Sequence, residues 1–386
     1  MKKLAIITTH PIQYNAPWFR LLAERKKVAL KVFYTWGQLE TESKYDPGFG
    51  KNIAWDIPLL QGYEYSFVKN ISKDPGSHHY NGIDNPSLVT EIKNYEPDAV
   101  LIFGWNFKSH LQAINSFHKK IPVLFRGDST LLDNDSNSFI RNFIKKIYLK
   151  KVYKKIDTAL YTGLENKKYF MHYGVPEKKL VFAPHAIDNK RFACATSSER
   201  KNFHIPDKAI VFLFAGKLEE KKDPLLLLDA FIQLNDTNSF LLMVGNGNME
   251  TGLKKKVESL PAIIKERILF TGFQNQTIMP GIYKMADVFV LPSKGPGETW
   301  GLAVNEAMAC SLPVLVSDKC GCYPDLVKEG INGYVFKHGD KQDLSNKMKL
   351  LLHHKNELKE MGNESAGIIS HWSFENICAS IENNML

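Results

Sequence analysis

The sequence lacks a hydrophobic run of about 20 residues, the length that a membrane-spanning helix needs. Its first residues, MKKLAIITTHPIQY, turn polar too soon for a secretory signal, so we expect a cytoplasmic protein. Its five cysteines are odd in number and lack the CxxC spacing of a zinc site, which predicts reduced thiols. We interpret the Cys320-Gly-Cys322 stretch as the lining of a loop and not as a metal or redox pair.

The length and composition predict a two-domain globular protein. A chain of 386 residues is too long for one compact core, and its 44% hydrophobic and 11% aromatic residues are enough to bury two.

The net charge of +9 is placed unevenly along the chain. Residues 1–185 hold 27 Lys and Arg against 17 Asp and Glu, whereas residues 186–386 hold 23 against 24. A basic first half suits an anionic membrane surface or a polyanion such as nucleic acid, but lysines that only confer solubility explain the charge equally well.

Short apolar runs alternate with segments of helical spacing in both halves. The runs include LAIITTH, VALKVFYT and DAVLIFG in the first half, and AIVFLFAGKL, FLLMVGNG and DVFVLPS in the second. This alternation predicts an α/β fold with two doubly wound parallel sheets, whose ligands collect at the carboxyl ends of the strands. The polar stretch ACATSSERKNFHIPDK suggests domains of residues 1–185 and 186–370, with a helix over 371–386 that packs back on the first domain.

One stretch, GPGETWGLAVNEAMACSLP at residues 295–313, combines an anion site with two carboxylates. A glycine-containing loop follows a strand, and a helix begins near Leu302, so free N–H groups and the positive helix end favour a diphosphate. Glu298 and Glu306 are eight positions apart and can accept hydrogen bonds from hydroxyls. Together these features predict a nucleotide-sugar site, although each glutamate alone is also compatible with a solvated surface charge.

This stretch resembles the E-x7-E motif of the retaining glycosyltransferases of family four, which have the GT-B fold of two Rossmann-like domains. AGKLEEKKDP resembles the family's G-R-L-x-x-x-K-G string, with Lys217 in place of arginine and Lys222 at the lysine. MVGNGNM, FTGFQN and APHAIDNKRF match further strings in the family's order, and HPIQY resembles the first loop of a subgroup. The resemblance implies an acceptor-binding first domain and a second domain that binds the nucleotide sugar.

The resemblance also implies roles for individual residues. Glu298 would hold the hydroxyls of the sugar, Lys217 and Lys222 would neutralise the leaving diphosphate, and His10 would be a polar contact or proton carrier. These four are the expected catalytic residues. The expected donor-binding residues are Glu306 (on the ribose), Gly216, Gly245, Gly247, Phe273, Thr299, Trp300, Gly301 and Leu302. The expected acceptor or sugar contacts are Gln13, Tyr14, Trp105, Arg126, Asp128 and His185.

Enzymes of this family need no metal and no cofactor beyond the donor, because lysines and a helix N-terminus stabilise the leaving group. The sequence agrees in lacking a convincing D-x-D motif after a strand, since Asp133 and Asp135 lie in a polar stretch.

The segment IRNFIKKIYLKKVYKKI, residues 140–156, predicts an amphipathic helix. One side would carry Ile140, Phe143, Ile144, Ile147, Tyr148, Val152 and Ile156, and lysines would cover much of the rest. Such a helix can lie on an anionic membrane where lipid-linked acceptors are found, or it can face the core with a solvated lysine side.

The function expected from these features is the transfer of a hexosyl or other sugar to a glycan or lipid-linked saccharide in surface polysaccharide synthesis. The first donor to consider is a UDP-sugar. The alternatives are a transferase that modifies nucleic-acid bases and a catalytically silent sugar-binding partner. Nucleic-acid-binding motifs are not evident, and the intact Glu298, Glu306, Lys217 and Lys222 argue against the silent partner.

Overall fold

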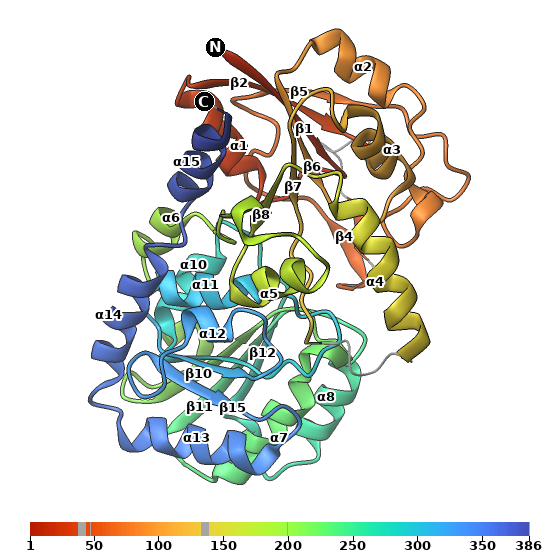
Figure 1. Cartoon of the computed structure of the whole chain (residues 1–386). Helices are drawn as coiled ribbons and strands as arrows, with labels where there is room; N and C mark the ends of the chain where they lie inside the picture. Colours follow the sequence, from red (N-terminus) through yellow and green to blue (C-terminus); the bar gives the residue numbers. More distant parts are fainter. Residues whose placement is uncertain (38–43, 47, 133–138, 199, 386) are drawn as a thin grey trace. The chain divides into compact units, whose positions relative to one another are not determined.

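The computed structural model describes residues 1–37, 44–46, 48–132, 139–198 and 200–385. The chain divides into two compact units (Figure 1). The first consists of Met1–Glu42, Ile57–His185 and Phe374–Leu386, and the second of Ser43–Asp56 and Ala186–Ser373. The second unit therefore contains a segment from early in the sequence.

The first unit is built on a parallel sheet with the order β5-β2-β1-β6-β7-β8-β9. The strands are β1 (Lys2–Thr8), β2 (Val28–Tyr34), β5 (Glu64–Phe67), β6 (Ala99–Phe103), β7 (Val123–Arg126), β8 (Thr158–Tyr161) and β9 (Leu180–Phe182). The apolar runs of the central strands β1, β6, β7 and β8 are largely buried, as expected for parallel strands covered on both faces, whereas the edge strands β5 and β9 are only partly buried.

The helices of the first unit are α1 (Ala16–Glu24), α2 (Leu88–Tyr95), α3 (Lys108–Phe117), α4 (Phe139–Tyr153), α5 (Leu164–His172) and α15 (Phe374–Met385), with the short 3₁₀ helices η1 (Tyr80–Gly82) and η3 (Glu177–Lys179). The terminal helix α15 packs against α1 and buries Ile377 and Ile381. Arg25 at the end of α1 donates two hydrogen bonds to Glu382, at 2.6 and 2.7 Å, and holds the pKa of that carboxyl below its usual value.

The second unit has a parallel sheet with the order β12-β11-β10-β13-β14-β15. Its strands are β10 (Ile210–Ala215), β11 (Ser239–Val244), β12 (Ile268–Gly272), β13 (Val288–Leu291), β14 (Val314–Ser317) and β15 (Gly333–Phe336). The direction of strand succession reverses between β10 and β13, and the corresponding reversal in the first sheet lies between β1 and β6. The predicted pair of doubly wound α/β sheets is confirmed, and each has a switch point where ligands of such sheets bind.

The helices of the second unit are α6 (Asn189–Ala193), α7 (Pro224–Leu234), α8 (Glu250–Glu258), α9 (Ala262–Lys265), α10 (Met279–Met285), α11 (Leu302–Ala309), α12 (Tyr323–Leu326), α13 (Lys341–His353) and α14 (Leu358–Ile369), with 3₁₀ helices η4 (Arg200–Phe203) and η5 (Glu220–Lys222). A hairpin of β3 (Lys44–Asp46) and β4 (Lys51–Ile53) joins this unit. The helix α11 packs against α6, α14 and the sheet, and most of its residues are buried. Of the helices in the described residues, none has the length and apolar composition to cross a membrane.

Candidate functional site

The candidate site of the second unit lies where β10, β11 and β13 end. Two glycines let the strand exits approach closely: a Cβ on Gly245 would lie 1.9 Å from the carbonyl oxygen of Gly216, and a Cβ on Gly247 would lie 2.4 Å from that of Leu218. Gly245 also has a φ of 131°, which residues with side chains rarely adopt. These turns therefore require glycine.

A buried ion pair joins η5 to the loop after β13. The ammonium of Lys222 contacts the carboxylate of Glu298, and only 15% and 8% of the two side chains are exposed. The hydroxyl of Ser293, two residues beyond β13, donates a 2.9 Å hydrogen bond to the same carboxylate. The structure thus brings together two of the predicted catalytic residues, and it adds Ser293, which the sequence analysis missed.

The pKa of Lys222 reflects two opposing effects. Burial alone would lower it, but the charge and the hydrogen bond of Glu298 outweigh burial, so the pKa stands above the ordinary 10.5. Lys222 is therefore a permanent cation at neutral pH, as the stabilisation of a leaving diphosphate requires.

The loop that carries Glu298 is tied to the loop after β14. Gly321 N–H donates to the carbonyl of Glu298 at 3.1 Å, and Cys322 N–H donates to that of Trp300 at 3.1 Å. The indole N–H of Trp300 donates to Asn305 at 2.8 Å, so this predicted donor-binding side chain is buried inside the loop. The loop then enters α11 through Gly301, whose φ of 100° belongs to the left-handed region.

Helix α11 begins at Leu302, as predicted, and carries Glu306 in its second turn. Glu306 is only 4% exposed and accepts a 2.8 Å hydrogen bond from the hydroxyl of Tyr283 on α10. The interpretation of Glu306 as a solvated surface residue is therefore wrong. Nothing in the sequence pattern indicated Tyr283 as its partner.

The cysteines beside this loop are buried free thiols. Burial raises the pKa of Cys320 to about 12 and that of Cys322 well above its usual value. Neither thiol is a thiolate at neutral pH, which agrees with a loop lining and not with a redox pair.

The hairpin from the first half of the sequence packs on the predicted donor-binding residue Phe273 and the predicted catalytic residue Lys217. The ring of Phe273, just after β12, lies 5.0 Å from the ring of Phe49 between centroids. The ammonium of Lys51 lies 4.4 Å from the centroid of the Phe273 ring. The ammonium of Lys217 lies 4.9 Å from the centroid of Phe49. Asp56 also accepts a hydrogen bond from Thr277 N–H at 3.2 Å. The hairpin therefore forms part of the surroundings of Lys217 and Phe273.

In the first unit, His10 follows β1 at the switch point of its sheet. Its Nδ1 lies 3.0 Å from the hydroxyl of Thr9, and its ring meets the edge of Trp36. Gln13 and Tyr14 follow in the turn that leads into α1. These residues occupy the strand exit where they were predicted.

Arg126 has a structural role that the sequence did not reveal. Its guanidinium is buried and donates to the carbonyls of Ala183 and Pro184 at 2.7 and 2.8 Å, and burial lowers its pKa to about 10. This anchors the segment that ends in His185, whose Nε2 lies 3.7 Å from the carboxylate of Asp128. Burial is the main reason why the pKa of His185 is lowered.

The FGWNFKSH string contains a buried histidine that was not predicted as a site residue. His110 bonds to the carbonyl of Phe103 at 2.7 Å and to the hydroxyl of Thr35 at 2.9 Å, and burial lowers its pKa to about 4. It is a neutral residue of the core. Trp105, the predicted contact in this string, packs edge-on against Tyr148 of α4.

Helix α4 has apolar residues on two opposite sides. Ile140, Phe143, Ile144 and Ile147 are 70%, 57%, 61% and 44% exposed, whereas Val152 is buried. Ile156 is also buried, but it lies beyond the end of the helix at Tyr153. The prediction that all of these share one side is therefore wrong.

The residues Asp133 and Asp135 lie outside the described part of the chain.

The second unit matches a known family. Residues 196–367 fit the model of the glycosyl transferases group 1. The chain is 26% identical over 287 residues to sulfoquinovosyl transferase SQD2 of Arabidopsis thaliana, which covers 70% of this chain and 52% of that protein. It is 31% identical over 175 residues, 43% of each chain, to the UDP-Gal:alpha-D-GlcNAc-diphosphoundecaprenol alpha-1,3-galactosyltransferase of Escherichia coli. The chain spans about half the length of these relatives.

The whole chain resembles solved structures of the predicted fold. The structure of Anabaena HepE in complex with UDP has a TM-score of 0.72 and 18% identity, and the match covers 100% of this chain and 99% of that one. The chain therefore has the GT-B fold of two Rossmann-like units.

Proposed function

We propose that this protein is a retaining glycosyltransferase that moves a sugar from a nucleoside diphosphate to a hydroxyl acceptor. The observation that carries the proposal is the buried Lys222–Glu298 pair at the switch point of the second sheet, beside the N-terminus of α11. Cationic and carboxylate side chains next to a helix N-terminus provide complementary groups for a diphosphate and for sugar hydroxyls.

Each charged group then has a distinct task. An ammonium has three N–H donors, so Lys222 can retain its contact with Glu298 and still donate to a phosphate oxygen. Glu298 accepts hydrogen bonds from the sugar and Glu306 from the ribose, while Lys217 adds a second cation for the diphosphate. The Tyr283 hydroxyl orients the carboxylate of Glu306.

The reaction breaks the bond between the sugar's anomeric carbon and the diphosphate oxygen. The acceptor oxygen bonds to the same face of that carbon, and its proton passes to the departing phosphate oxygen. The charge that develops on the diphosphate is stabilised by Lys222, Lys217 and the N–H groups that begin α11. This chemistry uses neither a protein nucleophile nor a metal ion.

The donor we propose first is a UDP-sugar. Anabaena HepE was solved with UDP, and the Escherichia coli relative is a galactosyltransferase named for UDP-Gal and a diphosphoundecaprenol substrate. We accordingly propose a glycan or lipid-linked saccharide as the acceptor, bound by the first unit.

A panel of UDP-, GDP- and ADP-sugars in a thermal-shift assay tests donor binding, because a bound donor stabilises the folded state. Product formation is then measured with the best donor, and the anomeric configuration of the product is read by NMR. Retention and unchanged rates in the presence of EDTA are the expected results. Inversion of configuration would contradict the proposed chemistry, and absence of turnover with every donor would favour a silent sugar-binding protein.

Side-chain variants test the assignment of roles. Lys222→Met and Glu298→Gln are expected to lower kcat by about 10²-fold or more, the loss caused by removing one transition-state contact. Glu258→Gln removes an exposed charge from α8, paired with Lys265, and serves as the control. Turnover that remains unchanged in Glu298→Gln, with the variant folded, would refute the assignment.

We also propose that α4 lies on an anionic membrane. Residues 140, 143, 144 and 147 follow the i, i+3, i+4, i+7 spacing of one helical face, and all four side chains are large, apolar and exposed. Val152 and Tyr153 hold the opposite side of the helix in the core of the unit. The exposed lysines Lys150, Lys151 and Lys154 follow at the end of the helix.

The transfer free energies of the exposed apolar side chains and the attraction of the lysines favour contact of this face of α4 with a membrane over its exposure to water. Full burial of one such apolar side chain yields about 1.5–3 kcal/mol, and each lysine near an anionic surface adds about 1 kcal/mol. An interfacial helix buries only part of each side chain, so we expect reversible binding that weakens with salt.

Sedimentation with lipid vesicles tests this contact. The wild-type protein should pellet with phosphatidylglycerol-containing vesicles and pellet less with pure phosphatidylcholine. The double variant Ile144→Asp/Ile147→Asp should remain in solution, whereas Ile263→Asp, at a 64% exposed isoleucine of the second unit, should bind normally. Equal vesicle binding by the wild-type protein and the double variant would refute the proposal. A wild-type dimer that the double variant cannot form, but Ile263→Asp can, would also refute it, because the face would then join two copies of the chain.

A further inference from the structure

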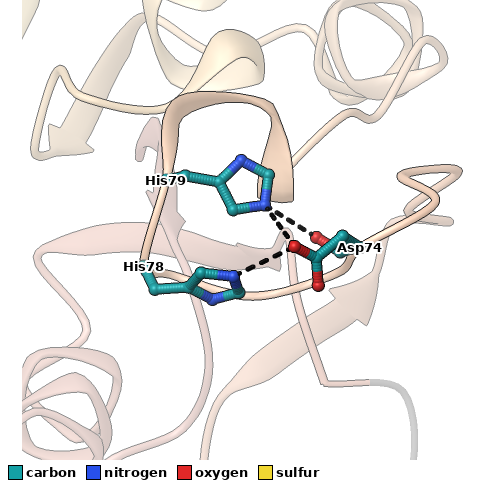
Figure 2. Close-up of side chains that lie close together, drawn as sticks. All are labelled: Asp74, His78 and His79. Atoms are coloured by element: carbon teal, nitrogen blue, oxygen red, sulfur yellow. Dashed lines mark hydrogen bonds and ion pairs between the residues drawn. The ribbon is translucent and has the colours of Figure 1, made fainter.

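Three metal-ligating side chains gather on the loop between β5 and α2. Figure 2 shows the rings of His78 and His79 turned toward the carboxylate of Asp74. The Nε2 atoms of both histidines lie 3.2 Å from the same carboxylate oxygen, Oδ2. The ligand atoms of the three residues all lie within 4.8 Å of one another.

Two of the three separations are close to those around a tetrahedral cation. Zinc binds imidazole nitrogen at about 2.0–2.1 Å and carboxylate oxygen at about 2.0–2.2 Å, so two of its ligands are roughly 3.3–3.5 Å apart. The observed 3.2 Å between each Nε2 and Oδ2 is close to this value. The ligand atoms of the two histidines lie within 4.8 Å of each other, and Nε2 of His79 also lies 3.0 Å from the backbone carbonyl oxygen of Asp74. A zinc ion between the three side chains would take the place of these hydrogen bonds, and a water molecule would complete the coordination.

The loop around the cluster is held in place by its own hydrogen bonds. Asn70 accepts from Asp84 N–H at 3.0 Å and donates to the carbonyl of Gly82 at 2.8 Å. Gly76 N–H donates to that same carbonyl at 3.1 Å, and a Cβ on Gly82 would lie 2.1 Å from the Gly76 oxygen. A Cβ on Gly76 would lie 2.5 Å from Nδ1 of His78, so glycine leaves room for the ring. Much of the entropy cost of ordering a metal-binding loop is thus already met by folding.

We propose that Asp74, His78 and His79 form a binding site for Zn²⁺, a cation whose preferred protein ligands include imidazole and carboxylate. No metal was predicted from the sequence, and these three residues have no part in the cysteine or D-x-D patterns. This site takes no part in sugar transfer and is independent of the proposed function. Its effect is to restrain the loop of residues 70–84.

Zinc titration of protein without a polyhistidine tag tests the site. After metal removal by chelation and dialysis, isothermal titration should show one saturable site per chain. His78→Ala and His79→Ala should each weaken it by at least about tenfold, a loss that even an outer-shell partner can cause. His353→Ala, at an exposed histidine of α13, is the control and should bind zinc as the wild-type protein does.

Two further measurements distinguish zinc coordinated by these three residues from nonspecific zinc binding elsewhere on the protein. Cobalt should give the visible absorption of a tetrahedral ion in the wild-type protein and in His353→Ala, but not in the double variant His78→Ala/His79→Ala. Zinc should slow amide exchange in residues 70–84 of the wild-type protein and of His353→Ala, but not of the double variant. Absence of saturable binding, or equal affinity in the wild-type protein and the double variant, would overturn the proposal and leave the cluster as ordinary hydrogen bonds.

Discussion

Replacing Glu298 by glutamine leaves the ammonium of Lys222 without its anion where only 15% of the lysine side chain reaches solvent. Breaking a buried ion pair costs about 3–5 kcal/mol, and we expect the lower end because glutamine preserves the volume. A loss of about 3 kcal/mol lowers the melting temperature of a domain of this size by about 6–12 °C. Urea unfolding at pH 7 and calorimetry measure these two quantities.

The penalty of Glu298→Gln should also depend on pH. In the wild-type protein the raised pKa of Lys222 means that its contribution to stability is complete below 10.5 and is lost as the pH rises through the folded value. In the variant, burial acts without the carboxylate, so the pKa of Lys222 falls and the lysine loses its charge earlier. The difference in unfolding free energy between the two proteins should therefore narrow as the pH rises toward and beyond 10.5.

A matched pair of variants makes the reasoning refutable. Glu258→Gln breaks an exposed ion pair and should change the unfolding free energy by less than about 1 kcal/mol. Lys222→Met/Glu298→Leu replaces both charges and should recover much of the loss. A cost below about 1 kcal/mol for Glu298→Gln, or a cost that does not change with pH, would refute a buried ion pair.

Three further predictions concern single contacts. Tyr283→Phe removes the hydrogen bond to Glu306, so it should lower the unfolding free energy by about 1.5–3 kcal/mol in urea and weaken donor binding in calorimetric titration; unchanged donor affinity would exclude the orienting role. Gly245→Ala forces a Cβ to 1.9 Å from a carbonyl oxygen and should destabilise the second unit strongly in the same unfolding assay. Gly252→Ala, in open space on helix α8, should instead stabilise this unit by about 0.5–1 kcal/mol. Because the pKa of Glu382 is lowered in the folded protein, its carboxylate stabilises the docked α15 at every pH above the pKa of the unfolded chain, and this stabilisation is lost as the pH falls through the folded pKa. Glu382→Gln should therefore lower the unfolding free energy most near neutral pH and least in acid. A loss that is the same at every pH would contradict this prediction.

The strands and the start of α11 were predictable because their signals are local. Apolar runs bounded by glycine and polar residues mark buried parallel strands, and Gly301 marks the entry into a helix. The edge strands β5 and β15 were not predicted: the segment Glu64–Phe67 is only four residues long and half polar, so its pattern is too short to recognise.

The partners of the site residues could not be predicted, because they come from distant positions. Phe49 precedes Phe273 by more than two hundred residues, and no local pattern shows that the hairpin joins the second unit. The hydroxyl of Tyr283 reaches Glu306 only because α10 packs on α11. Arg126 was predicted to contact a ligand because it ends a strand, but the carbonyls it binds become neighbours only after β7 and the segment following β9 are in place.

A crystal structure of the protein with bound UDP-glucose or the best donor of the panel tests the central claim most directly. We predict diphosphate oxygens within hydrogen-bonding distance of Lys222 and the first N–H groups of α11, ribose hydroxyls on Glu306 and sugar hydroxyls on Glu298. A nucleotide bound away from the ends of β10 and β13, with these side chains in the positions they have without it, would contradict the account.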